Sequence, residues 1–360
     1  MPKSTTPTVG VVWPDVNGAV STTITGKHIW QAAAAAVDPK LSTSIQAEKN
    51  FRHQYPKHVL ALTDLGAASS ENALAIATAG LDAVAESFAF VKPDGSRVTM
   101  AQAMETPSTT TKLHTGTVNG EVAVAQSLEI PGNQSRTDGL VLLQELAVRG
   151  SCEPDVATSV NSITSMSAAK LKSLLDTHVF VLLGGTSEMG PYLPLVKLGA
   201  TVVVVSRCNS KLSALVKAAR TTAAGPVVFP MNRAVTKEDD DNSLSEAAGA
   251  DVMTQAPELA AWLSTLYPDR TMVIGSYIYL DGEAHVRAVV AMDAVVTAVT
   301  SSRGKGRTAS MYLGSPATAH HISQAAWNDA QKRFADMPWY TALWSTPLSF
   351  KSNARPLIGE

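Results

Sequence analysis

The sequence predicts an α/β protein: a doubly wound parallel sheet in the C-terminal half, joined to a mixed α+β module at the N-terminus. Two observations predict the sheet. From residue 178, short runs of β-branched and other apolar residues alternate with segments whose apolar residues recur at helical spacing. The strand-like runs are continuously apolar, which is typical of parallel strands buried on both faces. The composition agrees, because 45% of the 360 residues are hydrophobic and 17% are charged.

Five strand–helix units make up the predicted sheet domain, residues 178–335. The expected strands are HVFVLLGG (178–185), ATVVVVSR (200–207), PVVFPM (226–231), TMVIGSYIYL (271–280) and RTASMYLGS (307–315). The expected helices are GPYLPLVKLG (190–199), SKLSALVKAAR (210–220), PELAAWLSTLY (257–267), AHVRAVVAMDAVVTAVTSS (284–302) and HISQAAWNDAQKRF (321–334). Regular alternation of this kind places helices on both faces of a parallel sheet.

The N-terminal module, residues 1–150, carries weaker patterns. Strands are expected at 9–13 (VGVVW) and 58–66 (HVLALTDLG), and a helix at 71–86 that Ser69 or Ser70 would cap. Two hairpins are expected, at 87–100 around Pro-Asp-Gly and at 115–130 around Asn119-Gly120. A Ser-rich helical connector (151–177) follows, and the chain closes with an aromatic and Pro-rich tail (336–360).

Net charge and composition limit the classes of partner that we expect this protein to bind. A formal net charge of −2 gives no electrostatic reason to expect nucleic acid, and no run of eighteen apolar residues predicts a membrane span. The two cysteines, Cys152 and Cys208, lie outside any metal or disulfide spacing, so no metal site is expected. We therefore expect a cytoplasmic protein that binds a small molecule, with organellar targeting left open. The tail aromatics Trp339, Tyr340 and Trp344 could anchor it to the N-terminal module or to a second subunit of a homo-oligomer.

A glycine-rich turn follows the first strand of the sheet domain. Gly184, Gly185 and Gly190 lie between strand and helix, where a backbone can approach a pyrophosphate closely. The second strand ends at Ser206-Arg207, and an arginine at that point suits the 2′-phosphate of NADP. The spacing therefore indicates a dinucleotide site, with an ordinary strand–helix turn as the alternative.

With these residues the sequence resembles the short-chain dehydrogenase/reductase superfamily, whose turn reads T-G-x-x-x-G-x-G. LGGTSEMG (183–190) aligns with that turn, except that Leu183 replaces the threonine and Glu188 the middle glycine. The resemblance covers about residues 176–335 and implies a Rossmann-like domain that binds NADP (NADPH). The residues that it implies for the cofactor are Gly184, Gly185, Thr186, Ser187, Glu188, Met189, Gly190, Ser206, Arg207, Gly275 and Ser276.

The family's catalytic Asn, Ser, Tyr and Lys correspond by spacing to Asp293, Ser315, Asn328 and Lys332. An asparagine cannot act as a proton-transfer acid near neutral pH, so another acid is needed. The segment YIYLDGEAHVR (277–287) supplies candidates at the carboxyl end of the sheet, namely Tyr277, Tyr279 and His285. Asp281 would instead cap the next helix, and His320-His321 could line the same mouth.

Asp293 carries the strongest indication of chemistry, because it interrupts an apolar helix and a buried carboxylate is costly unless paired or functional. The favoured hypothesis is an NADP-dependent oxidoreductase that reduces a carbonyl or enoyl group of a small or lipid-like substrate. Two alternatives stay open: a catalytically degenerate NAD(P)-binding sensor or partner subunit, and a Rossmann-like domain that binds another nucleotide.

Overall fold

The computed structural model describes residues 9–16, 19–105, 112–125, 128, 139–148, 152, 154–314 and 324–336. The chain forms two compact units. One comprises Met1–Gln126 with Ala169–Ala319, and the other comprises Ser127–Ala168 with His320–Glu360.

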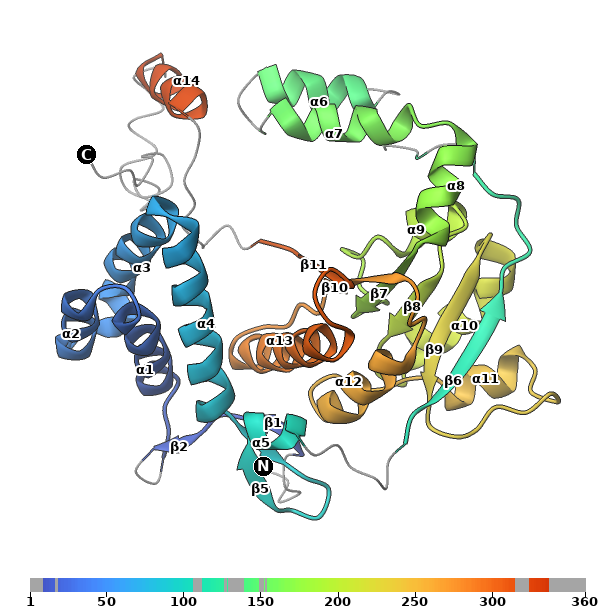
Figure 1. Ribbon diagram of the computed structural model, residues 1–360, viewed down its shortest axis with the longest axis horizontal. Coiled ribbons are helices and arrows are strands. Elements are labelled where there is room, and N and C mark those ends of the chain that lie inside the picture. The colour runs from blue at the N-terminus through green and yellow to red at the C-terminus, as the bar shows by residue number, and fades with distance from the viewer. Residues whose placement is uncertain are drawn as a thin grey trace. The chain divides into compact units, whose positions relative to one another are not determined.

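The larger unit is built on a six-stranded mixed sheet, which confirms the α/β class (Figure 1). In spatial order its strands are β11 (Thr308–Tyr312), β10 (Thr271–Ser276), β7 (His178–Leu183), β8 (Val202–Val205), β9 (Pro226–Met231) and β6 (His114–Asn119). The first five are parallel, as expected. The expectation of a purely parallel sheet is wrong at one edge, because β6 pairs with β9 in the antiparallel sense over six residues.

Helices cover both faces of this sheet. They are α8 (Ala168–Asp176), α9 (Tyr192–Lys197), α10 (Ser210–Thr222), α11 (Asp241–Ala247), α12 (Ala256–Thr265) and α13 (Glu283–Arg303). On one face, Val179, Val181 and Leu183 of β7 form a core with residues of α12 and α13. On the other face α9 contacts β8, and Leu212 and Val216 of α10 are fully buried. All four residues of β8 are buried, which explains its unbroken run of valines.

The connections create a switch point between β7 and β10. From β7 the chain runs to β8 and β9 on one side, then returns to β10 and β11 on the other side. In open parallel sheets a crevice forms where the connections diverge in this way, at the carboxyl ends of the strands. The glycine turn after β7 and the segment after β10 both leave the sheet at this edge.

The N-terminal part is more helical than the sequence predicts. Its helices are α1 (Thr22–Ala35), α2 (Pro39–Ala47), α3 (Phe51–Ala68), α4 (Ser70–Ser87) and α5 (Met100–Glu105). The strand expected at 58–66 is wrong, since these residues form the second half of α3. His58 and Leu62, four residues apart, both face a small core around Ile45 and Phe51. This spacing buries one face of a helix, and the short apolar run therefore does not form a strand. The helix expected at 71–86 is confirmed as α4, and the Ser69 hydroxyl accepts from the Asn72 amide at its start.

The short strands of this part form two small antiparallel sheets. β1 (Gly10–Val12), β4 (Ala89–Val91) and β5 (Arg97–Thr99) form one, while β2 (Asp15–Val16) pairs with β3 (Ala19–Val20). The strand expected at 9–13 and the hairpin expected at 87–100 are thereby confirmed. β1 is tied to the sheet domain: the Val11 amide donates to the Met253 carbonyl at 2.9 Å, and Arg287 Nε donates to the Val11 carbonyl at 2.6 Å.

The hairpin expected at 115–130 is wrong. Gly120 follows the end of β6, its amide donates to the Gly225 carbonyl, and a Cβ there would overlap the backbone of Ala223. Asn119-Gly120 therefore marks a close approach between two backbones and not a turn between two strands.

The smaller unit contains α6 (Gly139–Val148), α7 (Pro154–Thr164) and α14 (Gln324–Ala335), and α6 contacts α7. α7 and α8 confirm the helical character expected for 154–176. The domain boundaries expected at 150, 177 and 335 stay predictions.

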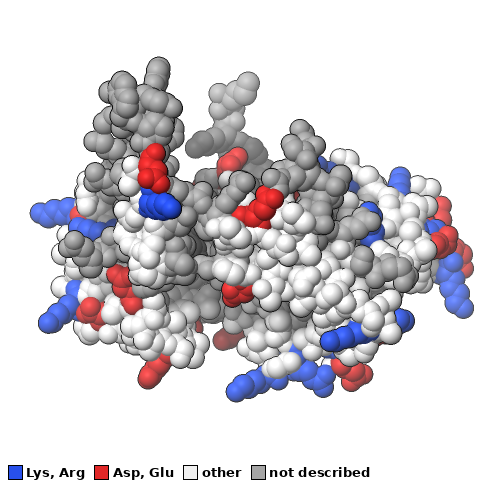
Figure 2. Space-filling model, turned by 90° about the horizontal axis from the view of Figure 1, so that it is seen from above, with Lys and Arg blue, Asp and Glu red and all other residues white. Residues whose placement is uncertain are grey.

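Two properties of the surface and composition bear on partners. On the face that Figure 2 shows, acidic and basic side chains are scattered among uncharged ones, in keeping with a net charge of −2. Within the described ranges, α13 is the one helix long and apolar enough by composition to cross a membrane. Its best 18-residue window is 33% buried inside the protein, and core helices of water-soluble proteins pass the same test.

Candidate functional site

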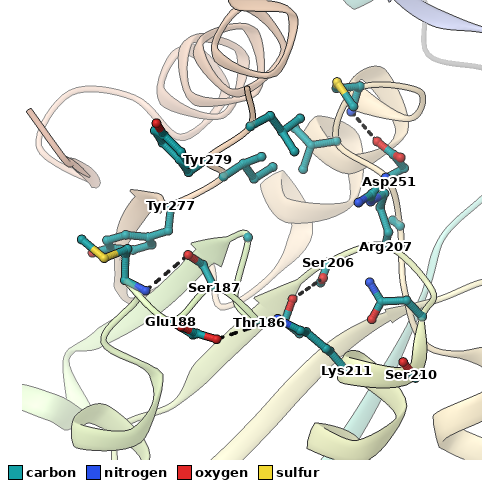
Figure 3. A pocket seen from close by; sticks show the side chains of 18 residues that line it. Thr186, Ser187, Glu188, Ser206, Arg207, Ser210, Lys211, Asp251, Tyr277 and Tyr279 are labelled. Atoms are coloured by element: carbon teal, nitrogen blue, oxygen red, sulfur yellow. Dashed lines mark hydrogen bonds and ion pairs between the residues drawn. The ribbon is translucent and has the colours of Figure 1, made fainter. Parts of the chain in front are cut away.

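A cavity of about 600 Å³ lies at the carboxyl ends of β7 and β8 (Figure 3). We name it the first cavity. Its wall comes from the glycine turn, the end of β8 with the first turn of α10, the segment after α11, and the segment after β10. The lining residues are Gly184, Thr186–Met189, Ser206, Arg207, Asn209–Lys211, Ala250–Met253 and Tyr277–Leu280. The site expected from the glycine turn and Arg207 is thus one continuous hollow at the switch point.

The glycine turn is shaped by its neighbours. Gly184 has φ +89°, and a Cβ there would lie 2.8 Å from Ile278 Cγ1. The amides of Gly184, Gly185, Ser187 and Gly190 all donate to backbone carbonyls of the protein. Among the described groups, the amides of Thr186 and Glu188 have no acceptor, so these two and the hydroxyls of the turn are what a phosphate would meet.

Glu188 does not face the turn's amides. Its side chain is 93% exposed and lies 4.0 Å from Lys211 Nζ, the pairing drawn as a dashed line in Figure 3. The carboxylate that interrupts the family's glycine pattern therefore points to solvent and a cation. Thr186, by contrast, shares a 2.9 Å hydrogen bond with the buried Ser206 hydroxyl, which joins the turn to the end of β8.

Arg207 is exposed and lines the first cavity beside the start of α10. Its side chain makes no hydrogen bond or ion pair with any residue that the structure describes. The Asn209 side chain caps α10 by accepting from the Leu212 amide, and Ser210 and Lys211 of the first turn line the same hollow. Asp251 lines the same hollow, and its Oδ1 accepts from the Met253 amide. The unpaired guanidinium, the lysine and the helix start favour an anionic group at this end.

A second cavity, of about 910 Å³, adjoins the first at the ends of β10 and β11. Both cavities are lined by Met189 and by the segment Tyr277–Leu280, which we name the bridge. The other residues lining the second cavity are Leu81, Ser276, Asp281, Gly282, His285, Val289, Met292, Asp293, Val296, Thr297 and Ser310–Gly314. One ligand could thus extend across the bridge from one cavity to the other.

The two tyrosines of the bridge differ in environment. Tyr277 is 5% exposed, and its ring covers Gly275 and lies against Gly190, while burial raises the pKa of its hydroxyl. Tyr279 is 74% exposed, and its ring centroid lies 5.3 Å from that of His285. Gly275 thus accommodates the Tyr277 ring, and it lines neither cavity. Tyr279 and His285 stand at the mouth of the second cavity instead.

Asp293 lies in the wall of the second cavity on α13. Burial raises its pKa from 3.8 to about 6, and no hydrogen bond or ion pair joins it to a described residue. A carboxyl group that titrates near neutrality inside a hollow is suited to proton transfer. Asp293 is therefore a half-buried carboxyl group in the wall of the second cavity whose raised pKa lies near neutrality.

The remaining expected residues are not brought into this arrangement. Ser315 and His320-His321 lie outside the described residues. Asn328 and Lys332 are exposed positions of α14 in the smaller unit. Ser276 does line the second cavity, next to the bridge.

Several lining residues were missed by sequence reasoning. Asp251, Ser310 and Leu81 come from segments after α11, in β11 and in α4, and none belongs to a motif. The first turn of α10 could have been found, since Asn209 and Ser210 lie two and three residues after Arg207 and carry the pattern of a helix start.

Comparison with known proteins adds no relative. No family model matches the chain, and neither a curated protein nor a solved structure matches it.

Proposed function

We propose that the protein is an NADP-dependent oxidoreductase with a Rossmann-like, short-chain-dehydrogenase-like sheet, which reduces a carbonyl or enoyl group of a small or lipid-like substrate. The observation that carries the proposal is the pair of adjoining cavities at the switch point. The first is lined by an unpaired arginine, and the second contains a carboxyl group that titrates near pH 6.

The residues of the first cavity fit a phosphorylated dinucleotide. Arg207 and the first turn of α10 would hold the 2′-phosphate, since arginine recognises phosphate through several donors in one plane. The hydroxyls of Thr186 and Ser187 and the two free amides of the turn would hold the pyrophosphate. Such a cofactor, when bound, supplies hydride to the substrate carbon.

The chain's own chemistry is proton transfer and shielding. Asp293 would give a proton to the substrate oxygen, because its raised pKa keeps part of the population protonated near neutral pH. Tyr277, whose pKa burial also raises, would serve as packing between the glycine turn and β10 and not as the acid. Leu81 and Met292 would exclude water from the reacting end of the second cavity.

Calorimetric titration with NADPH and NADH tests the proposal. We expect NADPH to bind more tightly than NADH. Arg207→Ala should lower the affinity for NADPH about 10- to 100-fold and change the affinity for NADH by less than about threefold. Lys217→Ala is the matched control, because it removes a positive charge from the exposed face of α10 outside the cavity. Absence of binding by either nucleotide would sink the proposal, and equal losses for both would remove the role assigned to Arg207.

One observation favours the catalytically degenerate alternative. No lysine or arginine is among the described residues that line the second cavity, so the family's pKa-lowering cation has no counterpart there. An NADPH-oxidation screen over aldehydes, ketones and enones separates the two. Turnover that Asp293→Asn abolishes supports the enzyme, whereas tight NADPH binding without turnover supports the sensor.

A third alternative is a sheet that binds another nucleotide. Titration with S-adenosylmethionine and a nucleotide sugar in the same instrument tests it. Either of them binding more tightly than NADPH would replace the cofactor assignment.

A further inference from the structure

A third cavity, of about 260 Å³, lies between α4, α5 and α13. Its wall is mainly apolar. Its apolar lining includes Leu81, Val84, Met100, Met104, Val290 and Ala294. Methionine side chains adapt to irregular apolar shapes, so two of them in so small a space suit a chain of variable conformation.

The third cavity adjoins the second. Leu81, Asp293 and Thr297 line both, so the Asp293 carboxyl stands where the two cavities meet. A molecule with its polar group beside Asp293 would direct an attached chain between α4 and α13.

The charge around these two cavities has one sign. Asp82 and Glu105 line the third cavity, Asp281 lines the second, and Asp293 lines both. Neither lining contains a lysine or arginine among the residues that the structure describes. An anionic head such as a carboxylate or phosphate would be repelled here, while an uncharged carbonyl or hydroxyl would meet a hydrogen-bonding partner.

We propose that the second and third cavities together bind one uncharged amphipathic molecule, its carbonyl or hydroxyl at Asp293 and an unbranched aliphatic chain between α4 and α13. The identity of the reacting group rests on the proposed function, but the binding of the chain does not. The substrate class is then medium-chain ketones, aldehydes or secondary alcohols, in preference to free fatty acids or phosphorylated thioesters.

Calorimetry of the full chain with 2-butanone, 2-hexanone, 2-octanone and octanoate tests the chemical class. We expect affinity to rise about fourfold per added methylene, and therefore by about 250-fold over the four methylenes that separate 2-butanone from 2-octanone. Octanoate should bind at least about tenfold more weakly than 2-octanone at pH 8. Affinity independent of chain length, or octanoate binding as tightly as the ketone, would overturn the proposal.

A pair of substitutions on one helix tests the location. Ala85 of α4 lines the third cavity, whereas Ala77 of α4 is exposed and lines none of the three. Ala85→Leu should reduce the affinity for 2-octanone to near that for 2-butanone, and Ala77→Leu should leave it unchanged. Ala294→Leu fills the same cavity from α13 and serves as the second variant if Ala85→Leu does not fold. Undiminished chain-length dependence in both filling variants would overturn the location.

NADPH titrated into the same samples separates this inference from the proposed function. Chain-length-dependent ketone binding without any NADPH binding would sink the proposed function and leave the cavity assignment standing. NADPH binding without chain-length dependence of ketone binding would support the proposed function and overturn the cavity assignment.

Discussion

The first and second cavities lie side by side at one edge of the sheet, yet their linings are opposite in character. The first contains Arg207 and Lys211 beside a helix start, together with Glu188, which lies near the lysine, and Asp251, which accepts from the Met253 amide. The second has no cation among its described lining residues and contains Asp293 among apolar side chains. Under the proposals above, the first cavity takes an anionic ligand group and the second takes an uncharged, partly apolar one.

Only the bridge and Met189 belong to both linings. The bridge is held in place by a 2.8 Å hydrogen bond from the Tyr277 amide to the Leu183 carbonyl, and by the close fit of Ile278 against Gly184. Its position therefore determines the shape of both cavities at once. The following substitutions test that dependence and the contrast between the cavities.

Substitution of Gly184 should have the largest effect. Gly184→Ala combines a strained φ of +89° with a Cβ only 2.8 Å from Ile278, and we expect a loss of about 3 kcal/mol in the free energy of unfolding. Gly95→Ala is the control, since Gly95 has φ +84° but nothing within 4 Å of its Cβ, and strain alone costs about 1 kcal/mol. Urea unfolding measures both. Equal losses of unfolding free energy in the two variants would mean that the bridge moves aside at little cost and does not define the shape of the cavities.

Asp293→Asn should remove a pH dependence specific to the second cavity. Since the folded-state pKa is raised from 3.8 to about 6, the carboxyl's stability contribution is fully present below pH 3.8 and is lost as pH rises through 6. The shift corresponds to at most about 3 kcal/mol, and water at the cavity mouth reduces this to about 1–2 kcal/mol.

The asparagine variant should therefore be more stable than the parent at pH 8 and equal to it near pH 4, as unfolding curves across that range will record. Asp281→Asn, on the exposed rim of the same cavity, is the control. The change in its free energy of unfolding between pH 4 and pH 8 should equal that of the parent protein. If the parent does not lose stability relative to the Asp293→Asn variant between pH 4 and pH 8, the assigned burial of the Asp293 carboxyl is contradicted.

Gly275→Ala tests the packing beneath the bridge. A Cβ at this position would overlap the Tyr277 ring, so we expect a loss of about 1–2 kcal/mol as the ring shifts. In a Tyr277→Ala background the same substitution should cost much less, because the overlapping ring is gone. A double-mutant cycle in urea gives the coupling energy. Additive losses would show that Gly275 is needed for another reason, such as direct contact with a ligand.

Glu188→Gln should have the smallest effect. An ion pair between side chains that are 93% and 70% exposed contributes little to stability, so the unfolding midpoint should not change measurably. NADPH affinity should rise by no more than about threefold, because one negative charge leaves the rim of the first cavity. A tenfold gain would place the carboxylate much nearer the phosphates than its outward position implies.

The sequence predicted the sheet more fully than the N-terminal part. Continuous β-branched runs such as Val202–Val205 have few other structures open to them when helices follow at regular intervals. The segment 58–66 was misassigned because a short apolar run fits a strand or a buried helix equally well, and only packing on Ile45 and Phe51 decides. The partner of β6 lies more than a hundred residues further along the chain, so no local pattern could reveal it.

For the candidate site, local motifs identified one cavity better than the other. Arg207 and the glycine turn were found because strand, turn and helix follow one another in sequence. The second and third cavities both depend on Leu81, which lies far upstream of α13 in the sequence and meets it only in the folded chain. Asp293 was found for an energetic reason, the high cost of a carboxyl in an apolar helix, and that reason needs no motif.

β6 also determines which fragments of this chain can be handled in isolation. It completes the hydrogen bonding of β9 along one whole border of the sheet, and it is supplied by residues 114–119, far upstream of the other five strands. A fragment starting at residue 169 would leave β9 as an exposed edge strand, and exposed edge strands pair with other chains. Structural or binding work on the sheet alone is therefore expected to yield aggregates unless residues 114–119 are retained or supplied as a peptide.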